Sequence, residues 1–318
     1  MLEYTPEYFE PLPFNRITTL FVSIDAIIFN TSMILNATLF YIFIKNYNPN
    51  TTSHEKAIAL LILCQFCWAT PYAVQYVLML IDGASFSFHQ CQYMGPILPI
   101  FSALTLLAHS IIALDRYSTI CKKSPMSKRC YFWIGLFFVP PVLISAILPL
   151  IIGSGYVLND KYYCFFNFMS TRLEDRLPTF IVFTYLGILI PMIIMCYYRI
   201  YRVIPDTFKE WNTKNDTALN ALNKKIVRTC VIVLSALLIC YTPVIATYLL
   251  QAIFQYQLPD GINHAISTIS IFDTLLSPLI LIHLIPLYNH GIKKILFGSR
   301  LDRKPDYALN YITKSSNY

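Results

Sequence analysis

Seven long apolar stretches constrain the fold of this 318-residue chain more than any other feature. An α-helix rises about 1.5 Å per residue, so roughly 20 mainly apolar residues cross the hydrocarbon core of a bilayer. Stretches of about this length or longer lie at 18–44, 56–81, 91–119, 131–152, 178–203, 225–254 and 262–288. The fold class expected is therefore an all-α membrane protein, a seven-transmembrane helix bundle.

Composition excludes several other classes of protein. Charged residues make up 13% of the chain, whereas soluble domains carry roughly 25%. The net charge of +7 is compatible with nucleic-acid binding, but the basic residues lie in short segments between the apolar stretches, where membrane insertion places them. The chain is therefore expected to contact membrane lipids and no nucleic acid.

The distribution of basic residues predicts how the chain crosses the membrane. With seven spans the termini lie on opposite sides, and only four of the 24 Lys and Arg residues fall on the N-terminal side. These four are Arg16, Lys161, Arg172 and Arg176. Because basic loops stay in the cytosol, the N-terminus is predicted to be extracellular and the C-terminus cytosolic.

This topology divides the chain into four parts. We expect an extracellular N-terminus at 1–17, the bundle at 18–288, an amphipathic membrane-surface helix at 289–300 and a disordered cytosolic tail at 301–318. The surface helix is predicted because 293–300 places basic residues on one side and apolar residues on the other. The largest loops, near 153–177 outside and 204–224 inside, are too short for a separate soluble domain.

The predicted topology sorts the nine cysteines by compartment. Only Cys91 and Cys164 lie on the outer side, where the environment is oxidising. The other seven lie in spans or near the reducing cytosol. A disulfide between Cys91 and Cys164 is predicted, which would tie the long outer loop to the third span; two free thiols are the alternative.

A charged motif stands at the inner end of the third apolar stretch. It reads Asp115-Arg116-Tyr117, and Cys91 lies 25 residues before Arg116. An Arg at a cytosolic helix end is expected from membrane topology alone. The tripeptide therefore gains its meaning only together with the motifs that follow.

Two further motifs lie in the sixth and seventh stretches. The sixth contains Cys-Tyr-Thr-Pro at 240–243 and the seventh contains Ser-Pro-Leu-Ile-Leu at 277–281, so that Pro243 and Pro278 are 35 residues apart. In order and spacing, the set resembles the motifs of rhodopsin-like (class A) G-protein-coupled receptors. The chain resembles a divergent member, because Tyr241 replaces the Trp of that family and Ser277 replaces its Asn.

The resemblance implies a plasma-membrane receptor, not an enzyme, that binds an extracellular ligand and activates a heterotrimeric G protein, with arrestin and a receptor kinase as further partners. The residues that it assigns to the activation switch are Asp115, Arg116, Tyr117, Tyr241, Pro243, Ser277 and Pro278. A proline inside a span removes a backbone hydrogen bond, so the two halves of the helix can swing. Asn223 stands near the place where many relatives carry an acidic partner for the Arg, so Asp115 is expected to be the main partner of Arg116.

The resemblance also implies a ligand pocket in the outer half of the bundle. Its expected residues are Leu98, Ser102, Phe183, Tyr241, Ile245, Tyr248, His264 and Ser267. This wall suits a small, largely apolar molecule or a peptide, although the same residues serve equally well as packing. Leu98 stands where amine receptors keep an Asp, which disfavours an amine held in that way. Ile271 stands where opsins keep the retinal-binding Lys, so retinal is not expected.

A polar cluster is expected near the centre of the bundle. Gln65 aligns with the Asp that the family carries in the second span, and Asp273 is taken as the only acidic residue deep within a span. The cluster that binds sodium in the family corresponds here to Asn36, Gln65, Thr105, Asp273 and Ser277. A protonated Asp273 in a structural hydrogen-bond network is the alternative. No other cofactor or metal is expected.

Two other seven-helix classes compete with the receptor. A transporter would show internal repeats, broken helices and more charge within the spans, and no repeat is found. A membrane hydrolase would need several His or acidic ligands converging on a metal, but the six His residues scatter over different depths. The receptor is therefore the preferred function, with a transporter as the alternative.

Overall fold

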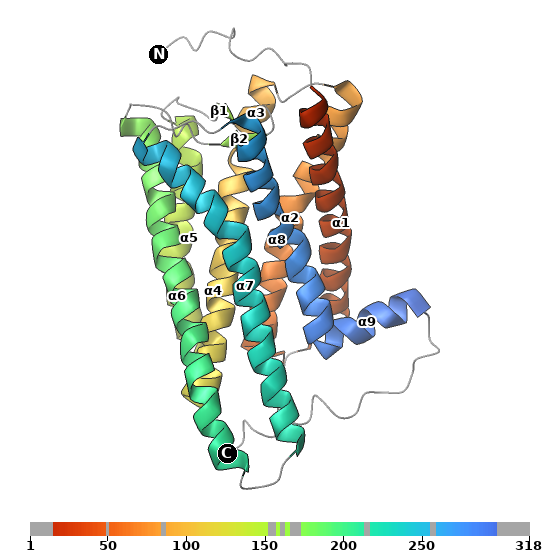
Figure 1. Ribbon diagram of the computed structural model, residues 1–318, viewed down its shortest axis with the longest axis vertical. Coiled ribbons are helices and arrows are strands. Elements are labelled where there is room, and N and C mark those ends of the chain that lie inside the picture. Colours follow the sequence, from red (N-terminus) through yellow and green to blue (C-terminus); the bar gives the residue numbers. More distant parts are fainter. Residues whose placement is uncertain are drawn as a thin grey trace.

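Nine helices and a two-stranded sheet make up the part of the chain that the computed structural model describes. The described residues are 15–48, 51–83, 87–151, 157–159, 163–165, 173–212, 217–254 and 259–297. Within them, seven helical segments are long and apolar enough to cross a membrane (Figure 1). The predicted all-α, seven-span bundle is confirmed, whereas the predicted tail at 301–318 and most of the segment 1–17 lie outside the described residues.

The elements follow the chain without large domains between them. The helices are α1 (Arg16–Asn46), α2 (Ser53–Asp82), α3 (Phe88–Met94), α4 (Ile97–Cys121), α5 (Lys128–Ile151), α6 (Leu173–Asn212), α7 (Thr217–Phe254), α8 (Asp260–Leu284) and α9 (Pro286–Phe297), and the strands are β1 (Val157–Asn159) and β2 (Tyr163–Phe165). The third predicted span corresponds to α3 followed by α4. The strands pair antiparallel between α5 and α6.

Local sequence signals set the ends of the first two spans. The Asn15 side chain accepts a hydrogen bond from the Thr18 N–H at 2.8 Å, which caps α1. At the start of α2, Thr52 and Glu55 form a reciprocal capping box. Gly83 ends α2 in the left-handed conformation, with φ +64°, which glycine adopts without a steric penalty.

Two boundaries differ from the sequence prediction. Helices α6 and α7 continue beyond 178–203 and 225–254, so the inner segment predicted as a loop near 204–224 is helical at both ends. Hydropathy marks where a helix leaves the bilayer, but a polar continuation rich in helix formers need not end there. The seventh span ends at Leu284 and α9 begins at Pro286, because proline lacks the N–H that would continue a helix and is well suited to start one.

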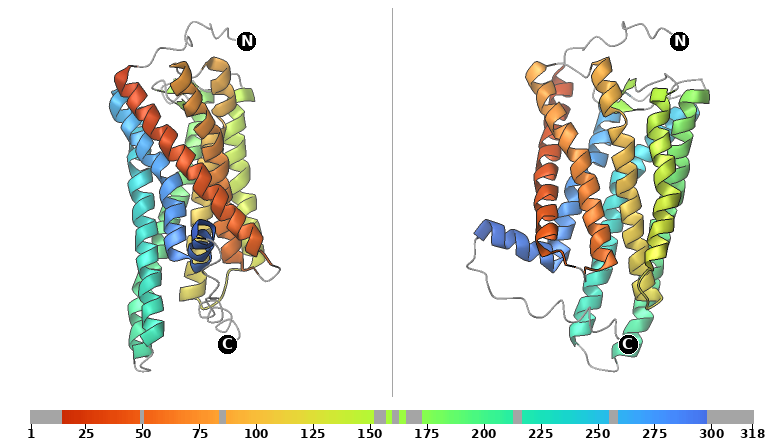
Figure 2. Two further views of the ribbon diagram at one scale, coloured as in Figure 1. Left: turned by 90° about the vertical axis from the view of Figure 1, so that its right-hand side faces the viewer. Right: turned by 180° about the vertical axis from the view of Figure 1, so that it is seen from behind.

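The helices form a bundle around α4, which packs against α2, α5 and α6. Helix α1 packs against α2 and α8, and α7 packs against α6 and α8 (Figure 2). Helix α9 turns away from the bundle axis and contacts α1 (Figure 1). We call the end of the bundle with α3 and the β-strands the disulfide end, and the opposite end, where α4 finishes, the Arg116 end.

The outward-facing surface of the bundle is apolar. Ile27, Ile81 and Ile239 are 68%, 73% and 65% exposed on three different helices. The polar residues Asn36 and Gln65, by contrast, are fully buried. This inversion of the soluble pattern is what a bilayer solvent requires, and the chain is a multi-pass membrane protein.

Candidate functional site

A disulfide joins Cys91 in α3 to Cys164 in β2, which confirms the predicted bridge. The two Cα atoms are 5.2 Å apart, within the usual range for disulfides. Both side chains are fully buried. The bridge ties the hairpin to the segment that leads into α4, close to Leu98, which borders the large cavity described next.

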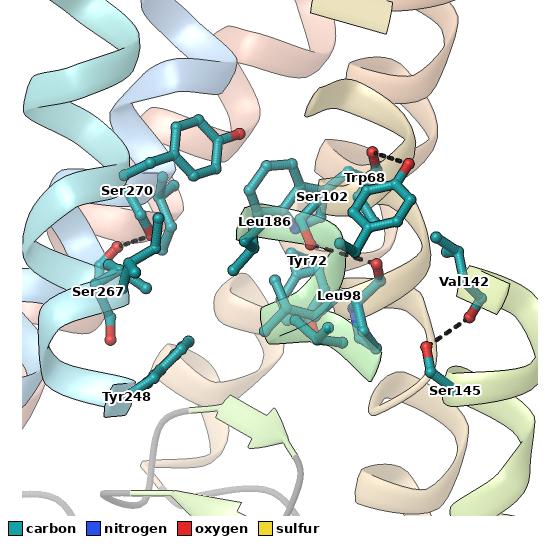
Figure 3. Close-up of a pocket in the computed structure, with 18 of the residues that line it drawn as sticks. Trp68, Tyr72, Leu98, Ser102, Val142, Ser145, Leu186, Tyr248, Ser267 and Ser270 are labelled. Atoms are coloured by element: carbon teal, nitrogen blue, oxygen red, sulfur yellow. Dashed lines mark hydrogen bonds between the residues drawn. The ribbon is translucent and has the colours of Figure 1, made fainter. Parts of the chain in front are cut away.

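A cavity opens between the helices on the disulfide side of Tyr241. Its empty space, including the part open to solvent, is about 1040 Å³, which leaves room for a small molecule. Six of the eight residues predicted to bind ligand border this one cavity: Leu98, Ser102, Tyr241, Ile245, Tyr248 and Ser267. Figure 3 shows several of them pointing into a common space from α4, α7 and α8.

The other two predicted residues do not border this cavity. Helix α6 contributes Tyr185 and Leu186 to the wall, and Phe183 lies on a neighbouring face of the same helix because side chains repeat every three to four residues. His264 is fully buried, with its Nε2 atom 3.6 Å from Oδ2 of Asp25. A role of either residue in ligand binding stays a prediction.

An aromatic wall that the sequence analysis missed closes the cavity toward α1 and α2. Phe29 stacks on Tyr72 and Tyr76, with ring centroids 5.4 and 5.6 Å apart, and meets Trp68 edge-on at 6.2 Å. All four residues border the cavity. The three α2 residues are spaced four apart, which places them on one helix face; this spacing was the available signal.

Asp25 corrects the expectation that Asp273 is the only acidic residue deep within a span. It lies in α1, inside the predicted span 18–44, and has no exposed surface. The Thr268 hydroxyl donates a 2.9 Å hydrogen bond to Oδ1 of Asp25. The correction matters because Asp25 borders the ligand-sized cavity.

Tyr241 joins this cavity to the polar centre of the bundle. Its hydroxyl donates a 3.1 Å hydrogen bond to Oδ2 of Asp273, and Ser277 donates a 3.0 Å hydrogen bond to Oδ1. His109 in α4, which the sequence analysis did not assign to the cluster, places Nε2 3.8 Å from Oδ2 of Asp273 and 3.5 Å from the Ser277 oxygen. The Asp273 carboxylate therefore links α7 to α8 and lies beside α4.

A second, smaller cavity begins on the other side of this hydrogen bond. It is bordered by His109, Asp273, Ser277 and Arg116. Tyr241 borders only the first cavity of the two, and Asp273 only the second. The hydrogen bond between Tyr241 and Asp273 thus separates two cavities, one on the disulfide side and one that reaches the Asp-Arg-Tyr motif.

Three oxygens in the predicted sodium cluster are buried without a hydrogen-bond partner among the described residues. They are Asn36 Oδ1, Gln65 Oε1 and Thr105 Oγ1. The amide nitrogens of Gln65 and Asn36 lie 3.4 Å and 3.3 Å from the backbone oxygens of Asp273 and Thr274. Two of the three side chains thus converge on one turn of α8 from α2 and α1.

Asp115 has close neighbours that the sequence analysis did not foresee. The hydroxyl of Tyr131 in α5 donates a 2.7 Å hydrogen bond to its Oδ1 atom, and Nδ1 of His54 in α2 lies 3.2 Å from Oδ2. Asp115 is buried, while Arg116 is partly buried and borders the second cavity. The motif at the end of α4 is thus connected to α2 and α5 through its carboxylate.

Residues 35–281 match the family described as 7 transmembrane receptor (rhodopsin family). The chain belongs to the rhodopsin family. This rhodopsin-family receptor is similar to trace amine-associated receptor 1 of Macaca mulatta, at 22% identity over 246 residues that cover 68% of this chain and 70% of the relative. The same receptor of Homo sapiens is 23% identical, with coverage of 68% and 69%.

A solved structure supports the fold of this rhodopsin-family receptor independently. Squid rhodopsin superimposes with a TM-score of 0.74 over 93% of this chain and 89% of the other, at 17% sequence identity. At that identity the likeness concerns the fold alone. Members of the family are receptors and not enzymes, so the predicted receptor class is confirmed and the hydrolase is set aside.

Proposed function

We propose that this receptor binds a small, largely apolar extracellular ligand in the large cavity and activates a heterotrimeric G protein at the Arg116 end. The observation that carries the proposal is the hydrogen bond between Tyr241 and Asp273. Tyr241 borders the cavity that would hold the ligand, and Asp273 borders the cavity that also includes Arg116. A ligand and a G protein would thus act on the two ends of one contiguous set of contacts.

The physical requirement for such a switch is a ligand that contacts two arrangements of the bundle differently. A ligand that displaces the Tyr241 ring stretches or breaks its 3.1 Å hydrogen bond to Asp273. Pro243 lies two residues further along α7, where the missing backbone hydrogen bond lets the two halves of the helix move separately. Movement of the ring can therefore be passed to the cytosolic half of α7.

The cavity wall supports a ligand that is mainly apolar. Ile271 borders the cavity where opsins carry the retinal-binding Lys, so a retinal Schiff base has no attachment point there. Leu98 borders it where amine receptors carry an Asp, so a trace amine held from α4 is not proposed, despite the similarity to a trace amine-associated receptor.

We propose the plasma membrane as the location and an extracellular N-terminus as the orientation. Support comes from the basic residues, of which only four lie on the N-terminal side. The disulfide points the same way, since such bridges persist in oxidising compartments. Arrestin and a receptor kinase follow as further partners from family membership alone.

A sodium ion in the central cluster belongs to the same proposal. Asn36, Gln65 and Thr105 each offer a buried oxygen without a hydrogen-bond partner in the described structure, and Asp273 offers a carboxylate. Oxygen ligands are those that hard cations prefer, so the residues fit the ion. A bound sodium would supply positive charge to the Asp273 carboxylate; its competitor for that place is the His109 imidazole, 3.8 Å away.

The test is a ligand screen with nucleotide exchange on purified G proteins of several classes as the readout. Arg116→Ala should abolish exchange while leaving surface expression and most of the ligand affinity, because 25 residues of helix, about 38 Å, separate Cys91 from Arg116. Tyr241→Phe keeps the ring and removes the hydrogen bond, so it should change the agonist-independent exchange rate. Full exchange activity in Arg116→Ala would refute the proposed coupling.

A further inference from the structure

Asp25 presents a carboxylate oxygen without a hydrogen-bond partner at the α1 wall of the large cavity. Its Oδ1 atom accepts the hydrogen bond from Thr268, but Oδ2 has no such partner in the described structure. The nearest nitrogen given for Oδ2, Nε2 of His264, is 3.6 Å away, beyond the usual range for an N–H···O bond. A buried carboxylate oxygen left in this way is costly, so Asp25 is an acceptor that a donor from the cavity would satisfy.

The surroundings of Asp25 favour a cationic donor. Phe29 lies one helical turn from it on α1 and stacks on Tyr72 and Tyr76 of α2, with Trp68 edge-on. Aromatic faces attract ammonium groups, the more strongly where water is excluded. Nε1 of Trp68 is also buried without a hydrogen-bond partner among the described residues, which leaves this end of the cavity ready for further polar contact.

We propose that the ligand carries an ammonium group that binds Asp25 beside this aromatic wall, while its apolar part extends toward Tyr241. Among the described residues, Asp25 is the one carboxylate that borders the cavity. The inference rests on the proposed function, since it names the chemical class of ligand for the same cavity. It places the cation on α1 and α8, and not on α4, where Leu98 leaves no charge.

His264 sets the competing arrangement. A protonated imidazole beside Oδ2 would balance the Asp25 charge internally and leave none for a ligand. In that arrangement amines would have no advantage over neutral molecules of the same shape. The preference for an amine over its neutral counterpart therefore decides between the two.

The experiment compares matched pairs of probes on the full-length purified receptor: phenethylamine with phenethyl alcohol, and tryptamine with tryptophol. Binding is measured as ligand-dependent thermal stabilisation, and signalling as nucleotide exchange. The amine of each pair should bind roughly 10- to 100-fold more tightly than the alcohol, as expected for a hydrogen bond to a charged group. This comparison uses the unmodified protein, so it does not depend on the folding of any variant.

Two variants then locate the effect. Asp25→Asn should remove most of the amine preference while keeping alcohol binding. Asp273→Asn makes the same chemical change at a buried carboxylate outside the cavity and should keep the preference. Equal binding of amine and alcohol by the unmodified receptor, no binding of either amine, or an amine preference that survives in Asp25→Asn would each overturn the inference.

The same data separate this inference from the proposed function. Exchange driven by the alcohols but not by the amines would leave the receptor function intact and remove the ammonium site. Amine stabilisation that depends on Asp25 but drives no exchange with any G-protein class would keep the site and count against the proposed coupling.

Discussion

Tyr131 donates a 2.7 Å hydrogen bond to Asp115, so the first turn of α5 is tied to the carboxylate that precedes Arg116. His54, in the first turn of α2, lies 3.2 Å from the other carboxylate oxygen. Asp115 is therefore held between side chains from two neighbouring helices. In this arrangement the end of α4 is anchored by its carboxylate, and the anchor must loosen for α4 to move relative to α2 and α5.

Tyr131→Phe should raise agonist-independent nucleotide exchange and lower the melting temperature of the purified receptor. The ring is kept, and the lost hydrogen bond to a charged group is worth about 1.5–3 kcal/mol when buried, with a smaller effect here because Tyr131 is only partly buried. Tyr201→Phe, at an exposed tyrosine of α6, is the matched control and should change neither quantity. Unchanged exchange and melting in Tyr131→Phe would show that the bond does not restrain α4.

Replacing the disulfide by Cys91→Ser together with Cys164→Ser should lower surface expression and thermal stability. The bridge spans 73 residues, and the loss of a native disulfide typically costs about 2–5 kcal/mol in small secreted domains. Mass spectrometry of non-reduced peptides should recover the two cysteines in one linked species. The exposed free cysteine Cys130 gives the control, since Cys130→Ser should leave expression unchanged; free thiols at both positions in surface protein would contradict the bridge.

Gly291→Ala should weaken the docking of α9 on α1. An added Cβ at Gly291 would lie 2.8 Å from Cγ2 and 2.9 Å from Cδ1 of Ile42, a side chain that is itself buried. Overpacking of this kind typically costs about 1–3 kcal/mol, which a lower melting temperature would reveal. Ile42→Ala in the same chain should recover part of the loss by making room.

Gly187→Ala in α6 is the control for that series, because nothing lies within 4 Å of the added atom. It should leave the melting temperature unchanged or slightly higher, since alanine is the better helix former. Equal melting temperatures for Gly291→Ala and the unmodified receptor would mean that α9 is free to shift away from Ile42.

The bundle itself was predictable from the sequence because the bilayer imposes a length on every span. The disulfide followed from topology, since only Cys91 and Cys164 were placed in an oxidising compartment. The extension of α6 and α7 beyond the membrane was missed because hydropathy is silent about helices in water. The break before Pro286 carried a readable signal in the proline itself.

Side-chain partners were the part that sequence could not supply. Asp25 meets Thr268 across 243 positions of the chain, and Tyr131 meets Asp115 across 16. Both pairings depend on how helices rotate about their axes in the packed bundle, and the hydrophobic period fixes that rotation only for helices with a clear polar face. Transfer of the family pocket found Leu98 and Ser102 because it copies a known rotation, but it had no template for the α1 and α2 wall.

Sodium should lower agonist affinity through Asp273. An ionised carboxylate with buried oxygens of Asn36, Gln65 and Thr105 in the same cluster attracts the ion, and the ion favours the arrangement in which the cluster stays open. A coupling of about 1–3 kcal/mol, or roughly 5- to 150-fold in affinity, is expected for two linked sites. The measurement is agonist binding in sodium chloride and in the chloride of a bulky organic cation at equal ionic strength.

Two variants separate the ion from the local hydrogen bonds. Asp273→Asn keeps an acceptor for the hydroxyls of Tyr241 and Ser277 but removes the charge, so it should abolish the sodium effect. His109→Leu removes the imidazole that lies 3.8 Å from the carboxylate, so it should strengthen the effect, because no internal cation then competes with sodium. An agonist affinity that ignores sodium in the unmodified receptor would instead identify Asp273 as a neutral hydrogen-bonding residue between α7 and α8.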